Sequence, residues 1–197
     1  MDDLRVCLLG DSYTLGQGDD TGLGWPGRVF AAARAAGHIL TFYNLGVRGD
    51  TGSQIAARAK AESDARFRNG DRKAVIISFG ANDLTQSRLL EESLEAFEAL
   101  LDWAKAEGHA VFVILPPVYL ESTRAVMAAA MSAAMANICE QSQVPFLDVR
   151  SVGVNWALWW TQARAGDGTH PGAEAYASLA AAFIRWPAWQ VWLTGLS

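Results

Sequence analysis

The sequence predicts an α/β fold, a three-layer α/β/α sandwich in which a parallel five-stranded sheet lies between two layers of helices. Short apolar runs alternate along the chain with longer stretches of helical periodicity. Each run is nearly continuous in apolar residues, which is typical of strands covered on both faces. Alternating strands and helices with connections of this length are typical of a parallel sheet. Five strands favour the flavodoxin-like strand order 2-1-3-4-5.

The apolar runs that predict the strands are short, and most of them stop at Gly, Pro, Asn or Asp. Segments of this length and composition that end at turn residues are typical of strands. In chain order the predicted strands are Arg5–Leu9, Leu40–Asn44, Ala74–Phe79, Ala110–Leu115 and Pro145–Val149.

Helical periodicity fills most of the chain between these runs. The clearest case contains Leu90, Leu94 and Phe97 at spacings of three and four, with glutamates between them. Gly108 then ends the pattern. The predicted helices are Trp25–Ala36, Gly52–Arg68, Ser87–Glu107, Ser122–Ser142 and Gly172–Trp186.

Two segments, one rich in methionine and one rich in tryptophan, have both a structural and a functional interpretation. Met127, Met131 and Met135 fall on one face of the fourth predicted helix, where a core stripe is expected and a binding surface is the alternative. The tail Trp186–Trp192 resembles an exposed apolar segment, so we expect it to serve packing or the contact of a homodimer.

Composition limits the classes of function. A chain of 197 residues that is 51% hydrophobic suits a single domain spanning residues 1–197. A net charge of -5 and the lack of a basic stripe argue against nucleic-acid binding. Cys7 and Cys139 lie in apolar patterns, which favours buried free thiols in a reducing compartment over a disulfide. With neither a signal-peptide pattern nor a bilayer-length apolar stretch, a cytoplasmic protein is expected.

Polar residues capable of chemistry follow the predicted strands. Ser12 comes after the first strand, Asn82 after the third, and Asp167 and His170 precede the last helix. The carboxyl ends of parallel strands meet at one edge of a sheet, where ligands of this fold class bind. We therefore expect these side chains to converge.

This set of residues suits acyl transfer. A neutral imidazole such as His170 can take the proton of the Ser12 hydroxyl, and Asp167, three residues earlier, can orient the ring. A developing oxyanion needs donors, for which the backbone N–H groups of Ser12 and Gly46 and the Asn82 amide are the candidates.

The motifs resemble those of the SGNH hydrolases, also called the GDSL esterase and lipase family. Four blocks occur in the family's order: Gly10-Asp11-Ser12, Asn44-Leu45-Gly46, Gly80-Ala81-Asn82-Asp83 and Asp167-Gly168-Thr169-His170. The resemblance implies Ser12 as nucleophile, His170 as base and Asp167 as its orienting partner. It also implies oxyanion donors at Gly46 and Asn82. Tyr13 stands where the family name has leucine, which puts substrate preference in doubt.

Each of these residues also has a structural interpretation. Ser12 could cap a helix, Asn82-Asp83 could form a turn, and Gly46 and Gly49 could serve only a positive φ. His38 and His109 are predicted at the amino edge of the sheet as solvent-facing or capping residues. This leaves His170 as the candidate base.

The aromatic residues near the predicted site are candidates for the substrate pocket or for the core. They are Tyr13, which flanks the nucleophile, and Trp156, Trp159 and Trp160, which precede Asp167.

The expected function is a serine esterase that needs no cofactor and no metal. The expected substrates are small-molecule carboxylic esters with short-chain, aryl or O-acetyl groups, or thioesters. A metal-dependent phosphoesterase is one alternative, because Asp11, Asn82, Asp83 and His170 could be drawn as ligands. A non-catalytic flavodoxin-like binding module is the other.

Overall fold

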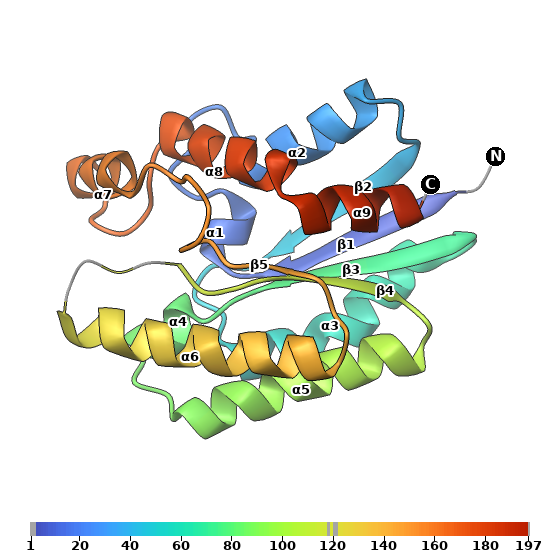
Figure 1. Ribbon diagram of the computed structural model, residues 1–197, viewed down its shortest axis with the longest axis horizontal. Helices are drawn as coiled ribbons and strands as arrows, with labels where there is room; N and C mark the ends of the chain where they lie inside the picture. Colours follow the sequence, from blue (N-terminus) through green and yellow to red (C-terminus); the bar gives the residue numbers. More distant parts are fainter. Residues whose placement is uncertain (1–2, 118, 120–121, 197) are drawn as a thin grey trace.

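The predicted sheet is present in the structure, a computed structural model that describes residues 3–117, 119 and 122–196. Five parallel strands pair in the order β2-β1-β3-β4-β5, so the predicted topology is confirmed. The strands are β1 (Leu4–Gly10), β2 (Leu40–Gly46), β3 (Arg72–Ser78), β4 (Ala110–Ile114) and β5 (Phe146–Leu147). All five carboxyl ends lie at the same edge, on the left of Figure 1.

Helices cover both faces of this sheet. Figure 1 shows α2 (Gly24–Ala35), α8 (Ala173–Arg185) and α9 (Pro187–Gly195) on one face, and α3 (Gly52–Phe67), α5 (Leu90–Ala106) and α6 (Ser122–Gln141) on the other. The remaining helices lie near the carboxyl edge: α1 (Ser12–Leu15), α4 (Ala81–Thr85) and α7 (Trp156–Ala165). This arrangement leaves that edge as the place where loops from different layers meet.

Some boundaries differ from those predicted, for local reasons. The helix predicted from Ser87 begins at Leu90, because Ser87 takes a φ of 55° at the end of the α4 turn. The last strand is only Phe146–Leu147 rather than 145–149. Pro145 has no N–H to donate to the sheet, and Asp148 turns the chain by accepting the Arg150 N–H at 2.9 Å.

One prediction about side-chain environment is wrong, and a second is confirmed only in part. His109, predicted to be solvent-facing or capping, is 8% exposed, and its ring packs edge-on against Phe67 and Trp103. Met131 and Met135 are buried as the core stripe requires, whereas Met127 is 40% exposed.

The C-terminal tail is also not the exposed segment that its sequence suggested. Trp189 and Trp192 are buried, and Trp189 packs against Phe30 and Phe183. The half-buried Trp186 donates its indole N–H to the Phe146 carbonyl at 2.9 Å. The tail therefore completes the core of its own chain, which removes the reason for expecting a dimer contact there.

Cys7 and Cys139 are free and buried, as predicted. Burial raises the pKa of both thiols to about 12, so they are structural rather than reactive. Among the described helices, none combines the length and the apolar character that a bilayer crossing requires.

Candidate active site

Ser12 lies directly beyond the end of β1 as the first residue of α1. Asp11 caps this short helix by accepting the Tyr13 N–H at 2.9 Å. Gly10 permits the close packing of the end of β1, because a Cβ at that position would lie only 2.6 Å from the Ser78 carbonyl oxygen of β3. The strand end and the cap together fix the serine at the carboxyl edge of the sheet.

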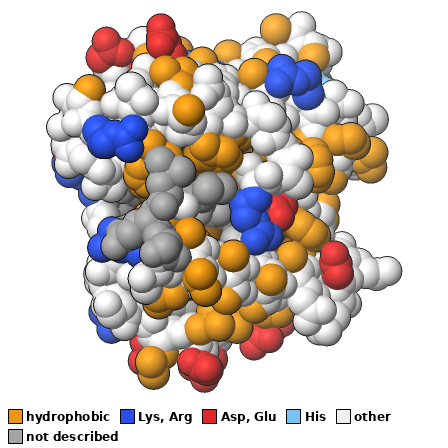
Figure 2. All heavy atoms as spheres, turned by 60° about the vertical axis from the view of Figure 1, so that its left-hand side comes forward, with side chains coloured by type: hydrophobic (Ala, Val, Ile, Leu, Met, Phe, Trp, Pro, Cys, Tyr) orange, Lys and Arg blue, Asp and Glu red, His pale blue; other side chains and the backbone are white. Residues whose placement is uncertain are grey.

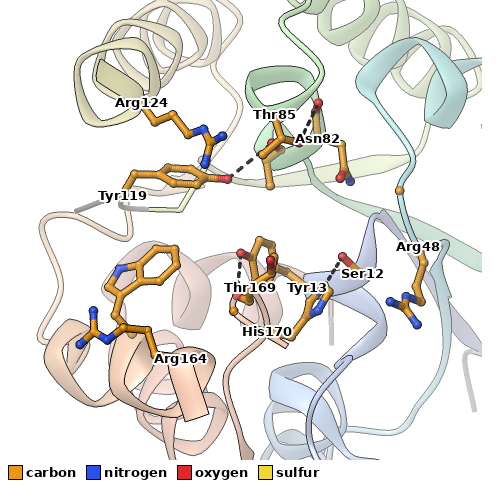
Figure 3. A pocket seen from close by; sticks show the side chains of 14 residues that line it. Ser12, Tyr13, Arg48, Asn82, Thr85, Tyr119, Arg124, Arg164, Thr169 and His170 are labelled. Atoms are coloured by element: carbon orange, nitrogen blue, oxygen red, sulfur yellow. Dashed lines mark hydrogen bonds between the residues drawn. The ribbon is translucent and has the colours of Figure 1, made fainter. Parts of the chain in front are cut away.

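His170 contacts Ser12 across 158 residues of sequence. Its Nε2 lies 2.8 Å from the Ser12 Oγ, a contact drawn as a dashed line in Figure 3. Its Nδ1 lies 2.6 Å from an Asp167 carboxylate oxygen. The structure therefore brings together all three side chains that the sequence singled out, in a chain of two hydrogen bonds.

The loop from Asp167 to His170 is organised by the carboxylate itself. One Asp167 oxygen accepts the backbone N–H groups of His170, at 2.8 Å, and Thr169, at 3.0 Å. The backbone N–H of His170 and then its ring hold the pKa of Asp167 well below its usual range. A permanent negative charge therefore faces the Nδ1 side of the ring.

The buried carboxyl of Asp11 has a different environment. Burial raises its pKa to about 7, although backbone N–H groups of the α1 turn oppose the shift. Asp11 faces the inside of the turn and contacts neither Ser12 Oγ nor His170 through a hydrogen bond in the described part of the chain. Its position indicates a bracing role.

The geometry contradicts the prediction that Gly46 supplies an oxyanion donor. Its N–H already donates to the Asn44 side chain at 3.0 Å, and Gly46 is still part of β2, paired with Gly10. A Cβ on Gly46 would lie 2.8 Å from the Asp11 carbonyl oxygen, so the glycine permits the close approach of α1 to the end of β2. Its φ is not positive.

Gly49 is the loop residue that sequence reasoning missed. It lines the cavity beside Ser12 and has a φ of 84°. No acceptor within the described residues takes the N–H of Gly49 or that of Ser12. A second strand two residues longer, ending at Gly46 rather than at Asn44, would have been the signal, because it places Gly46 in the sheet and leaves Gly49 in the loop.

Asn82 lies in the first turn of α4, with its amide toward the strand ends. Its Nδ2 donates to the Asp50 carbonyl at 2.9 Å and lies 3.5 Å from an Asp11 carboxylate oxygen. Asp83 is structural, since it accepts the Gly52 N–H at 3.1 Å and the Ser93 hydroxyl at 3.0 Å. Asp83 thus holds α4 against α3 and α5. Asn82 is held by the hydrogen bond from one of its side-chain N–H groups to the Asp50 carbonyl.

The convergent side chains open onto a cavity of about 660 Å³. Figure 3 shows its walls, and Figure 2 shows the face onto which the carboxyl edge opens. The described lining residues are Ser12, Tyr13, Arg48, Gly49, Ala81, Asn82, Thr85, Tyr119, Arg124, Trp160, Arg164, Gly168, Thr169 and His170. The sequence had not indicated Tyr119, Thr85 or the three arginines.

The predicted pocket aromatics divide into two groups. Tyr13 and Trp160 line the cavity, where Trp160 packs against Tyr119 at a centroid distance of 5.7 Å. Trp159 is buried behind Tyr13, and Trp156 packs against Trp159, so neither lines the main cavity. Both border a second cavity of about 30 Å³ instead.

Tyr13 also supports the histidine loop. Its hydroxyl donates to the Thr169 carbonyl at 3.1 Å, and its ring is tilted against His170 at a centroid distance of 5.5 Å. A leucine at this position would lack that hydrogen bond. No three His, Cys, Asp or Glu side chains in the described ranges are arranged as a metal site.

Comparison with known proteins gives a consistent result. Residues 8–177 match the model of the GDSL-like lipase/acylhydrolase family. Among solved structures, the chain is similar to an acetylxylan esterase from Geobacillus stearothermophilus, with 21% identity, a TM-score of 0.72 and 93% of each chain covered. It is also similar to a lipase/acylhydrolase from Enterococcus faecalis, with 24% identity, a TM-score of 0.68 and 94% of each chain covered.

A G-D-S-L family protein from Desulfitobacterium hafniense DCB-2 shares 19% identity at a TM-score of 0.69, covering 89% of this chain and 98% of that one. These identities support the likeness of fold only. No curated protein matches the sequence.

Proposed function

Because the chain belongs to the GDSL-like lipase/acylhydrolase family, and is thus a carboxylic ester hydrolase, we propose that it works through Ser12, His170 and Asp167 by way of an acyl-enzyme. One observation carries the proposal. The Ser12 hydroxyl lies 2.8 Å from His170 Nε2 while His170 Nδ1 lies 2.6 Å from Asp167, at the wall of a substrate-sized cavity.

The acylation step follows from this geometry. His170 Nε2 takes the Ser12 proton as Oγ attacks the ester carbonyl carbon, and the carbonyl π electrons move to oxygen. Asp167 keeps the Nδ1–H tautomer and stabilises the imidazolium. When the tetrahedral intermediate collapses, the C–O bond to the alcohol breaks and His170 returns the proton to the leaving alkoxide.

Deacylation repeats the same steps with water as the nucleophile. His170 takes a proton from water, the hydroxide adds to the acyl carbon, and collapse releases the carboxylic acid while Ser12 regains its proton. In both steps the oxyanion would be held by the N–H groups of Ser12 and Gly49 and by the Asn82 amide.

The substrates in this proposal are small esters with short-chain, aryl or O-acetyl groups. Thioesters would be cleaved by the same catalytic side chains. The cavity volume and the Tyr119–Trp160 pair support an acyl or alcohol group of modest size with an apolar or flat face. An acetylxylan esterase has a similar fold, which makes acetyl esters a suitable first choice of test substrate. Family membership favours ester hydrolysis over a metal-dependent phosphoesterase or a non-catalytic binding module.

Replacing the nucleophile tests the proposal. Ser12→Ala removes the attacking oxygen, so kcat on 4-nitrophenyl acetate should fall by at least about 10³. Ser53→Ala, the same change on the exposed face of α3, should retain wild-type activity. Thermal unfolding of both variants reports on the fold, and a Ser12→Ala protein that keeps its fold and more than about a tenth of wild-type kcat would end the proposal.

A further inference from the structure

All the Asp, Glu, Lys and Arg side chains that line the cavity are positively charged. Among the described lining residues these are Arg48, Arg124 and Arg164, and no Asp or Glu is present. The chain as a whole has 21 acidic and 16 basic residues, so its overall composition does not explain why these lining residues are all basic. On the face shown in Figure 2, basic and hydrophobic side chains surround the centre, and most acidic ones lie at the margins.

The arginines come from different elements and flank different parts of the cavity. Arg48 lies in the loop between β2 and α3, and Figure 3 shows it on the side of Ser12. Arg164 follows Trp160 by one helical turn on α7, and Figure 3 shows it with Arg124 on the side of Tyr119. Cations thus stand on both sides of the reacting groups.

Arg48 and Arg164 form no ion pair and no hydrogen bond with any residue that the structure describes. Other arginines of the chain are engaged: Arg58 binds Asp50 at 2.7 Å, and Arg150 binds Asp148 at 2.7 Å. A guanidinium offers five donors in a planar fork that matches a carboxylate or phosphate. These two groups therefore have their donors available.

The electrostatics of helix ends explains the position of only one of the three arginines. Arg164 lies in the last turn of α7, where a cation is favourable. Arg124 lies in the first turn of α6, where a cation is unfavourable, and Arg48 lies in a loop. Their shared property is the cavity that they line.

We propose that the physiological substrate is an anionic ester, whose carboxylate or phosphate is bound by Arg48 or Arg164 while its carbonyl meets Ser12. The inference rests on the proposed function and adds a substrate class to it. Charge-assisted hydrogen bonds would orient the ester, and the positive cavity would raise the rate of encounter with an anion.

Two matched pairs of esters test this inference. For an anion on the acyl side, mono-4-nitrophenyl glutarate is compared with 4-nitrophenyl pentanoate. For an anion on the alcohol side, 4-acetoxybenzoate is compared with 4-acetoxybenzamide. In at least one pair the anionic ester should have a kcat/KM about ten-fold higher, the ratio expected from one charge-assisted hydrogen bond.

Variants of the two arginines show which of them causes the preference for the anionic ester. Arg48→Gln or Arg164→Gln should lower the anionic-to-neutral ratio by about three- to ten-fold. Arg185→Gln makes the same change in net charge at the exposed end of α8, away from the cavity, and should leave the ratio unchanged. Added salt should reduce the wild-type preference because it screens exposed charges.

Three results would overturn the inference: no anionic preference in either pair, a preference that persists in both cavity variants, or an equal loss in Arg185→Gln. The proposed function is tested separately by the neutral esters. If the wild type cleaves them and Ser12→Ala does not, the mechanism stands even where the anionic preference fails.

Discussion

At the scale of single residues, Asn82 joins the reacting edge to the loop that follows β2. One amide N–H donates to the Asp50 carbonyl at 2.9 Å, while the 3.5 Å distance to Asp11 leaves the other poorly satisfied. An amide with one N–H fixed and one available suits an oxyanion that forms only during the reaction. The same side chain therefore orients itself and offers a donor.

Asn82→Ala should lower kcat for ester hydrolysis by about 10² to 10³ with little change in KM, because the lost interaction exists only in the transition state. Asn137→Ala, on the exposed face of α6, is the matched control and should behave as wild type. Steady-state kinetics on a neutral acetate ester measures both. A kcat for Asn82→Ala within about two-fold of wild type would remove Asn82 from the oxyanion site.

The convergence of the polar side chains was predictable from the sequence, whereas the positions of the backbone N–H groups were not. Ser12, Asp167 and His170 could be singled out because hydroxyl, carboxylate and imidazole groups have few other uses together at one sheet edge. Gly46 was chosen over Gly49 as the oxyanion donor because the sequence does not show which glycine N–H faces the cavity. Only the strand register, which pairs Gly46 with Gly10, shows which glycine is free to face the cavity.

At the scale of elements, His109 links the end of α5 to the start of β4. Its ring lies 4.8 Å from Phe67 of α3 and 5.6 Å from Trp103 of α5, between centroids. Neither ring nitrogen meets a hydrogen-bond partner among the described residues. Burial, with a smaller contribution from Lys73, lowers the pKa of His109 below its ordinary value of 6.5. The helices therefore pack around a neutral imidazole.

The stability of this packing should depend on pH. The unfolded chain binds a proton at His109 below about pH 6.5, and the folded chain does so only at lower pH, so stability present above pH 6.5 is lost as pH falls. His109→Phe keeps the aromatic packing and removes the titration. Urea unfolding should therefore show a smaller loss of stability between pH 7.5 and pH 5.0 in the variant. Equal losses in the two proteins would contradict this account of His109.

Long elements were predictable, and short ones were not. Five of the helices covering the sheet, α2, α3, α5, α6 and α8, were predicted to within a few residues, whereas α9 was not predicted as a helix. Helices α1 and α4 have only four and five residues, too few for a period to appear, and they depend on tertiary contacts such as the Asp83 bonds to Gly52 and Ser93. The short β5 similarly ends where Asp148 turns the chain.

At the scale of the whole molecule, topology explains why distant residues meet. The parallel order β2-β1-β3-β4-β5 places the ends of β1, β2 and β3 side by side, so Ser12, Gly49 and Asn82 approach one another. The segment before α8 then returns His170 to the same edge. Strand–helix alternation made this arrangement predictable. The burial of Trp189 was not predictable, because it depends on α9 folding back over Phe30 and Phe183.

The central claim is that His170 activates Ser12 at this edge, and covalent labelling tests it most directly. After incubation with diisopropyl fluorophosphate, intact-mass and peptide analysis should find one adduct, on the Oγ of Ser12. His170→Ala should form that adduct much more slowly. An active enzyme labelled at another residue, or one whose Ser12 reacts equally fast without the imidazole, would contradict the account.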